Sequence, residues 1–221
     1  MPHAADNRTL KHGCIVMASG VGARFGGNKL MAELCGAPLV GHVVRATDDL
    51  FSRRVVVTRH ADVAALCETL GAQVVLHDEP CRNDTVRLGM EAMDGCDTVT
   101  FVQGDQPLIR PASIVALLRA AERDAAGAAR RDTVGRGVAH IWRTSFDGVP
   151  GAPVLFPSWA FDELRSLPRG KGGGFVAKAH AECVRTIEVS SEWELFDVDT
   201  RDDLEQLQTH VARCGSAGLP R

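Results

Sequence analysis

The chain has 221 residues, with 25 basic and 28 acidic side chains and a formal net charge of −3. A chain of this length buries about 70% of its unfolded surface, so it needs no disulfide or metal in order to fold. The weak net charge, without basic clusters, argues against nucleic-acid binding through phosphates. No apolar run approaches the ~20 residues of a membrane-spanning helix, so we expect neither nucleic acid nor membrane as a partner.

Seven cysteines are scattered along the chain without a C-x-x-C pair. This pattern is typical of free thiols in a reducing compartment, and the N-terminus has no apolar stretch like that of a secretory signal. The H-x-E triplets at His77 and His180 lack a following P-C-x-x-C, which disfavours a deaminase-type zinc site. We therefore expect a cytoplasmic protein with one domain over residues 13–212 and flexible termini at 1–12 and 213–221.

The hydrophobic pattern alternates between short apolar runs, typical of buried strands, and helical spacing. The expected strands lie at 14–18, 53–58, 73–77, 97–103 and 184–189, with further β signals across 138–156. The expected helices lie at 38–44, 63–70, 85–93, 111–121, 158–167 and from 200 onward. Strands alternating with helices predict an α/β fold with a mostly parallel, mixed sheet and helices on both faces. Residues 120–136 are expected to be a helix end and a mobile loop, and 169–174 (RGKGGG) a second glycine-rich loop.

The loop after the first strand, ASGVGARFGGNK at 18–29, contains four glycines and the cations Arg24 and Lys29. Glycines allow backbone amides to turn toward a ligand, and the two positive charges suit a triphosphate. The loop is not a Walker A motif, because Lys29 does not directly follow a glycine. It is not a dinucleotide loop either, because Phe25 stands where the third glycine is required. An ordinary tight turn between strand and helix is the alternative.

Acidic residues occur at two further junctions. QGDQPL at 103–108 puts Asp105 directly after a strand, and FDVDT at 196–200 puts Asp197 and Asp199 before the last helix. Mg²⁺ is usually held by one or two carboxylates and by substrate phosphates. These residues are therefore candidate metal ligands, although Asp is also common in turns and at helix starts.

In this order, the three motifs resemble those of the MobA-like nucleotidyltransferases, and within them the molybdenum cofactor cytidylyltransferases. The matching segments, between about residues 13 and 208, are VMASGVGARFGGNK, GDQPLI, GAPVLFPSWAFDELRSL and FDVDTRDDL. The resemblance implies a single-domain, Rossmann-like nucleotidyltransferase fold. It also implies Mg²⁺-dependent transfer of CMP from CTP to the terminal phosphate of molybdopterin, with release of pyrophosphate. A recipient molybdoenzyme or its chaperone would be a transient partner.

The resemblance further implies roles for individual residues. Arg24, Lys29 and Asp105 would be catalytic, and the metal would be held by Asp105, Asp199 and Asp197. The acceptor would be bound by Gly151, Pro153 and Lys171. The nucleotide would be bound by Ala18, Ser19, Gly20, Val21, Gly22, Arg24, Lys29, Asn83, Thr85 and Gly104.

Two departures from the family pattern and a second resemblance leave alternatives open. Ser19 stands where the family usually has Ala or Gly near the base, and the loop at 170–174 lacks an expected acidic residue and an arginine. The segment CRNDTVRLG at 81–89 also resembles the methylerythritol-phosphate cytidylyltransferases. The alternatives are guanylyl transfer, cytidylyl transfer to a sugar or polyol phosphate, and a non-catalytic accessory protein that binds the nucleotide or cofactor.

Overall fold

The computed structural model describes residues 9–130 and 137–214. Its central sheet has seven strands in the order β5-β4-β1-β6-β8-β7-β9. The strands are β1 (His12–Ala18), β4 (Arg53–Thr58), β5 (Gln73–Leu76), β6 (Thr98–Gln103), β7 (Ile141–Phe146), β8 (Val149–Pro157) and β9 (Val184–Glu188). The first four in the sheet order are parallel, whereas β8 is antiparallel to both β6 and β7. The predicted mixed α/β sheet is confirmed.

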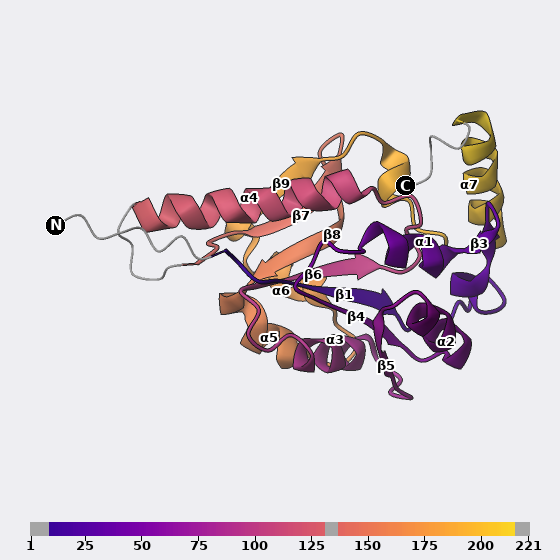
Figure 1. The fold of residues 1–221 in the computed structure, drawn as a ribbon, viewed down its shortest axis with the longest axis horizontal. Helices are drawn as coiled ribbons and strands as arrows, with labels where there is room; N and C mark the ends of the chain where they lie inside the picture. The colour runs from indigo at the N-terminus through magenta and orange to yellow at the C-terminus, as the bar shows by residue number, and fades with distance from the viewer. Residues whose placement is uncertain (1–8, 131–136, 215–221) are drawn as a thin grey trace.

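Helices cover both faces of this sheet, and Figure 1 shows α4 along one face and α3 and α5 along the other. The helices are α1 (Leu39–Ala46), α2 (Ala61–Thr69), α3 (Arg82–Glu91), α4 (Pro111–Arg130), α5 (Phe161–Arg165), α6 (Gly173–Ala179) and α7 (Arg201–Cys214). Successive residues of β1 point to opposite faces. Ile15 packs with α3, α5 and α6, whereas Cys14 and Val16 pack with α1, α2 and α4.

A third apolar cluster lies beyond the sheet edge and connects segments that are distant in the sequence. It joins Phe25 of the glycine-rich loop to Leu108, Val198 and Leu207. Leu108 lies just after Asp105, and Val198 lies next to Asp199, so burial of this cluster brings both acidic segments to the glycine-rich loop. Phe25, which excludes a dinucleotide loop, is therefore a packing anchor for the site.

Several predicted elements were wrong in their bounds. α3 begins at Arg82 rather than Thr85, and α4 continues to Arg130 because its alanine-rich second half favours helix. Residues 131–136 of the predicted loop lie outside the described residues. Gly173 and Gly174 begin α6, a helix stabilised by burial of Val176 and Ala177 although glycine disfavours helix.

The short hairpin of β2 (Glu33–Leu34) and β3 (Ala37–Pro38) was not predicted. Among the described residues, β1 begins at His12 and α7 ends at Cys214. The domain bounds of 13–212 stay a prediction. The parts of the expected flexible termini at 1–8 and 215–221 lie outside the described residues. All seven cysteines are described and are free thiols. No described helix is long and apolar enough to cross a bilayer.

Candidate active site

The candidate site lies where the neighbouring parallel strands β1 and β6 end. The glycine-rich loop follows β1, and Gly104 and Asp105 follow β6. The amide of Gly104 donates to the carbonyl of Met17 at 3.0 Å, and the amide of Val198 donates to the carbonyl of Asp105 at 3.0 Å. These backbone bonds place the three predicted motifs at one edge of the sheet, where ligands of open α/β sheets bind.

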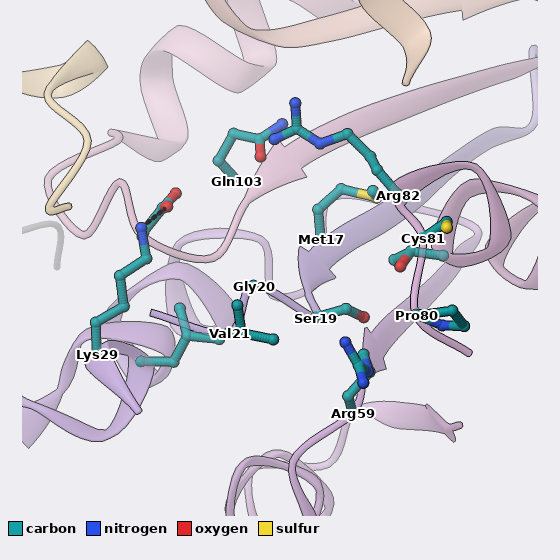
Figure 2. A pocket seen from close by; sticks show the side chains of 13 residues that line it. Met17, Ser19, Gly20, Val21, Lys29, Arg59, Pro80, Cys81, Arg82 and Gln103 are labelled. Carbon is teal, nitrogen blue, oxygen red and sulfur yellow. Dashed lines mark hydrogen bonds and ion pairs between the residues drawn. The ribbon is translucent and has the colours of Figure 1, made fainter. Parts of the chain in front are cut away.

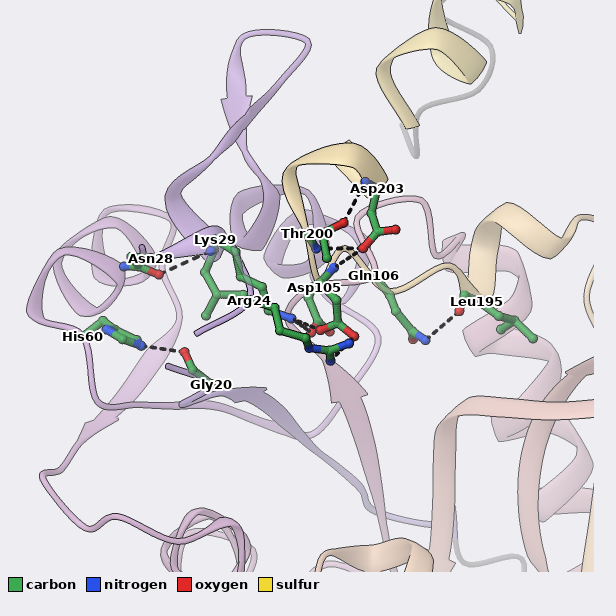
Figure 3. Close-up of polar contacts among 12 residues, drawn as sticks. Gly20, Arg24, Asn28, Lys29, His60, Asp105, Gln106, Leu195, Thr200 and Asp203 are labelled. Atoms are coloured by element: carbon green, nitrogen blue, oxygen red, sulfur yellow. Dashed lines mark hydrogen bonds and ion pairs between the residues drawn. The ribbon is translucent and has the colours of Figure 1, made fainter. Parts of the chain in front are cut away.

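Lys29 is the centre of an ionic cluster at this edge (Figure 3). Its Nζ lies 2.6 Å from Oδ2 of Asp105 and 2.7 Å from Oδ1 of Asp199. Arg24 Nη2 lies 2.6 Å from the other oxygen of Asp199. The Lys29 side chain is only 8% exposed, whereas that of Arg24 is 71% exposed. The cluster therefore contains one buried cation and one that reaches into solvent.

The charges in this cluster shift the pKa values of its members. Burial alone would lower the pKa of Lys29, but the charges and hydrogen bonds of Asp105 and Asp199 outweigh burial and raise it. The hydrogen bond from Lys29, with the charge of Arg24, lowers the pKa of Asp199. Desolvation and the nearby charges of Asp105 and Asp199 raise the pKa of Asp197 to about 6, although that residue is exposed. Two carboxylates thus bind one buried ammonium group, and the charge of that group also acts on Asp197.

The start of α7 fixes the position of Asp199. The amide of Asp203 donates to Thr200 Oγ1 at 3.1 Å, and Asp203 Oδ2 accepts from the amides of Thr200 and Asp199 at 2.7 and 3.0 Å. This arrangement is a capping box, with Asp in place of Glu or Gln. It satisfies the amide of Asp203 in the first turn of α7 and leaves the Asp199 carboxylate facing Lys29.

The glycine-rich loop is shaped by a tight turn at Gly22. The carbonyl of Gly22 accepts from the amides of Phe25 and Gly26 at 2.9 and 3.1 Å. Gly22 has φ +60°, and a Cβ at this position would lie 2.1 Å from the carbonyl oxygen of Gly27. Only glycine fits there. The turn brings Lys29, which begins the short helix η1 (Lys29–Met31), back to the strand ends.

A cavity of about 250 Å³ lies beside this cluster (Figure 2). It is lined by Met17, Ser19, Gly20, Val21, Lys29, Leu30, Arg59, Pro80, Cys81, Arg82, Thr85, Gln103 and Asp105. Six residues predicted for the site are therefore among its lining residues. The side chain of Asn83, by contrast, accepts from the amide of Gly170 at 2.8 Å and donates to Asp84 at 3.1 Å. It does not line this cavity, and its contact with the nucleotide stays a prediction. Ala18, Gly22 and Gly104 shape the backbone around the cavity.

A second cavity, of about 670 Å³, adjoins the first and shares the lining residues Met17, Arg82 and Gln103. The predicted acceptor residue Lys171 lines it, together with Lys178. Gly151 and Pro153 do not line it. Gly151 packs against Leu195, where a Cβ would come within 2.9 Å of a Leu195 methyl carbon, and Val154 of the same strand lines the cavity instead.

Arg59, Arg82 and Gln103 line the first cavity but were not predicted as site residues. Each of them directly follows or ends a strand, or begins a helix, at the ligand-binding edge. Their positions in the sequence therefore indicate that these residues lie near the ligand-binding edge. The orientation of their side chains, however, is determined by tertiary packing.

The carboxylates could hold a hard cation only together with a ligand. No group of three or more His, Cys, Asp or Glu side chains poised to hold a metal occurs in residues 9–130 and 137–214. Asp105 and Asp199 nevertheless converge on one nitrogen atom, so a cation at that place would meet both carboxylates. Two carboxylates completed by phosphate oxygens are a normal donor set for Mg²⁺, so these residues fit the ion.

Comparison with known proteins agrees with this geometry. The chain is 37% identical over 113 residues to a 3-deoxy-manno-octulosonate cytidylyltransferase from Anaeromyxobacter sp. (strain Fw109-5). The matched segment covers 45% of this chain and 44% of that protein. The chain thus matches less than half the length of this relative.

Two solved structures share the fold. One is the homologue of Mycobacterium tuberculosis Rv0371c from Mycobacterium sp. strain JC1, with TM-score 0.74, 24% identity and coverage of 92% of this chain and 98% of that one. The other is a CMP:2-keto-3-deoxy-manno-octonic acid synthetase complexed with CTP, with TM-score 0.70, 16% identity and coverage of 93% and 100%. The family model of the MobA-like NTP transferase domain matches residues 14–184, most of the chain. The chain belongs to the MobA-like NTP transferase family.

Proposed function

We propose that this protein is a nucleotidyltransferase that transfers CMP from CTP to the terminal phosphate of a molybdopterin-type acceptor and releases pyrophosphate. The observation that carries the proposal is the cluster of Lys29, Arg24, Asp105 and Asp199 beside the first cavity, which adjoins a second one. Family membership supports nucleotidyl transfer. The cytidylyltransferase relative supports cytosine as the base.

The first cavity is the proposed nucleotide site, with its triphosphate end at Lys29. Gly20 and Val21 line this cavity beside Lys29, and Arg24 reaches into solvent from the same loop. Ser19, Arg59 and Pro80 lie on the side away from Lys29 in Figure 2 and would surround the base. This assignment pairs the cationic side of the cavity with the anionic part of the ligand.

The second cavity is the proposed acceptor site. Phe101, Phe156 and Val154 provide apolar lining, whereas Lys171 and Lys178 provide positive charge. An apolar wall with cations suits a phosphorylated, flat heterocycle such as a pterin. A sugar or polyol phosphate would offer this wall hydroxyl groups to bury, which favours the pterin.

In the proposed reaction, an oxygen of the acceptor phosphate attacks the α-phosphorus of CTP in line, and the bond to pyrophosphate breaks. Lys29 and Arg24 would stabilise charge on the pyrophosphate, since nucleotidyl transfer requires mainly positioning and charge stabilisation. Mg²⁺, held by Asp105 and Asp199 with Asp197 nearby, would neutralise phosphate charge. Lys29 would then exchange its carboxylate partners for phosphate oxygens.

Arg82 is suited to join the two substrates because it lines both cavities. The attacking and attacked phosphates are both negatively charged and repel each other. A guanidinium with five donors can bond two phosphates at once. We therefore assign Arg82 to the α-phosphate and the acceptor phosphate together.

The test is release of pyrophosphate from CTP, GTP, UTP or ATP with Mg²⁺, each with and without molybdopterin. Release that requires both CTP and molybdopterin supports the proposal. Pyrophosphate release with 3-deoxy-manno-octulosonate or a polyol phosphate in place of molybdopterin would overturn the proposed acceptor. Release with GTP and molybdopterin, but not with CTP and molybdopterin, would overturn cytosine as the base. Binding of CTP without pyrophosphate release, with or without an acceptor, would identify the protein as a non-catalytic carrier. If the acceptor is correct, transfer of the product to a recipient molybdoenzyme or its chaperone follows.

The variant Arg82→Met tests the bridging role. We expect it to raise KM for both substrates and to lower kcat, because both phosphates lose a charged donor. Arg87→Met is the matched control on the same helix. Arg87 pairs only with Glu91 on the surface at 2.8 Å, and such pairs contribute little.

A further inference from the structure

The side of the first cavity away from Lys29 contains a cation that the phosphate chemistry does not use. Arg59 directly follows β4, and Figure 2 shows its side chain extending toward Ser19. Its Nε is buried without a hydrogen-bond partner. Within residues 9–130 and 137–214, no hydrogen bond or ion pair of the guanidinium is formed. Arginine has five donors and no acceptor, and an unpaired buried donor costs free energy, so this arrangement favours a ligand that brings acceptors.

The neighbouring hydroxyl cannot supply a donor to such a ligand. Ser19 Oγ donates its one hydrogen to the carbonyl of Val57 at 3.1 Å. His77 Nε2 lies 2.9 Å from the same oxygen, so the histidine is the donor in this second contact. Burial, with the nearby charge of Arg59, lowers the pKa of His77, which favours the neutral ring. The Ser19 hydrogen is thus used inside the protein.

We infer that Arg59 selects the nucleobase by donating to two adjacent acceptor atoms on its edge. The inference deepens the proposed function and rests on it. Cytosine presents O2 and N3 side by side as acceptors, whereas N3 of uracil carries a hydrogen that would face the guanidinium. A site built from such donors rejects a base that leaves them unpaired. Guanine presents the same chemistry through O6 and N7, and the experiment separates the two bases.

The experiment measures dissociation constants for CTP, UTP, GTP and ATP with Mg²⁺ by calorimetry. The variant Arg59→Lys keeps the positive charge but loses the two parallel donors. We expect the preference for CTP over UTP to fall by about 5- to 150-fold, the discrimination of a bidentate arginine–base contact. UTP affinity should change little, because it depends on the triphosphate end. Arg45→Lys, at an exposed position of α1 outside both cavities, is the matched control.

The outcomes separate this inference from the proposed function. A wild-type protein that binds no nucleotide would contradict both the inference and the proposed function. A wild-type preference for CTP that survives in Arg59→Lys would overturn the role of Arg59 and leave cytidylyl transfer standing. A wild-type preference for GTP that is lost in the variant would keep the role of Arg59 and replace cytosine with guanine.

A second variant, Arg59→Met, removes the charge as well. Equal weakening of all four nucleotides in Arg59→Met, with selectivity unchanged in Arg59→Lys, would show a phosphate contact and overturn the inference. Because the guanidinium has no partner within the described residues, Arg59→Met should unfold at the wild-type temperature or above it. That result would show that a change in selectivity does not arise from misfolding.

Discussion

Asp105 and Asp199 come from opposite halves of the chain, yet their carboxylate oxygens lie 2.6 and 2.7 Å from the same atom, Lys29 Nζ. The lysine therefore occupies the place where a cation would meet both carboxylates. Removing Lys29 should have opposite effects on catalysis and on metal binding.

Lys29→Ala should lower turnover by about 10²–10³-fold, the usual effect of removing one charge-stabilising donor. The same change leaves the carboxylates without their buried counter-charge. We therefore expect Mg²⁺ alone, without nucleotide, to raise the unfolding temperature of Lys29→Ala more than that of the wild type. Calorimetry with and without Mg²⁺ measures this, and Lys11→Ala at an exposed position is the control. Near-normal turnover would refute the assignment of Lys29.

Arg24→Ala should separate function from stability. The Arg24 side chain is 71% exposed, and exposed ion pairs contribute ~0–1 kcal/mol to folding. The unfolding temperature should therefore change little, whereas KM for CTP should rise because the triphosphate loses a cation. Arg45→Ala, also exposed, should change neither quantity. A loss of stability without a change in KM would make Arg24 a structural residue.

Asp197→Asn should stabilise the protein increasingly as the pH rises from about 4 to about 6, and by a constant amount above that. The folded-state pKa of Asp197 is about 6, raised from 3.8, so the folded protein holds an extra proton between these values. Stability from this group is present below pH 3.8 and is lost as the pH rises through 6. Asn cannot ionise, so the variant should unfold at a higher temperature than the wild type at about pH 7.5 and at a similar one near pH 4.

Thermal unfolding of both proteins in a chelator, across this pH range, checks the prediction. Asp162→Asn, at an exposed position of α5, should give a difference from wild type that does not vary with pH in this way. A constant difference for Asp197→Asn as well would show that its pKa is not raised in the folded protein.

Two glycines of the same loop give a matched pair. Gly22→Ala puts a Cβ 2.1 Å from the carbonyl oxygen of Gly27 at a positive φ, whereas a Cβ at Gly27 has no atom within 4 Å. We expect Gly22→Ala to weaken CTP binding at least tenfold and to lower stability by ~1–3 kcal/mol. Gly27→Ala should leave stability within about 0.5 kcal/mol of wild type. Titration with CTP and denaturant unfolding measure both effects, and equal behaviour of the two variants would contradict the strained turn.

The meeting of Lys29 and Asp105 could be predicted because loops after parallel strands converge at one edge of the sheet. Asp199 was placed there by the resemblance of its motif to the family. The glycines, cations and carboxylates at those positions then indicated the chemistry. The fold class followed from the alternating periodicity.

The remaining differences came from tertiary packing. Helix α6 begins in a glycine run with poor helix propensity, and its buried residues outweigh that propensity. Arg59 and Arg82 carry no local signal of the direction in which their side chains point. Gly151 was placed at the acceptor site from its motif, whereas in the structure it packs against Leu195.

The wall that the two cavities share at Met17, Arg82 and Gln103 has a kinetic consequence. Once CMP is joined to the acceptor, the dinucleotide product would occupy both cavities and contact more of the protein than either substrate does. Its departure should then be slower than that of CTP or acceptor, and it should compete with each of them. We therefore expect turnover to be limited by release, and to accelerate when a downstream receiver withdraws the dinucleotide.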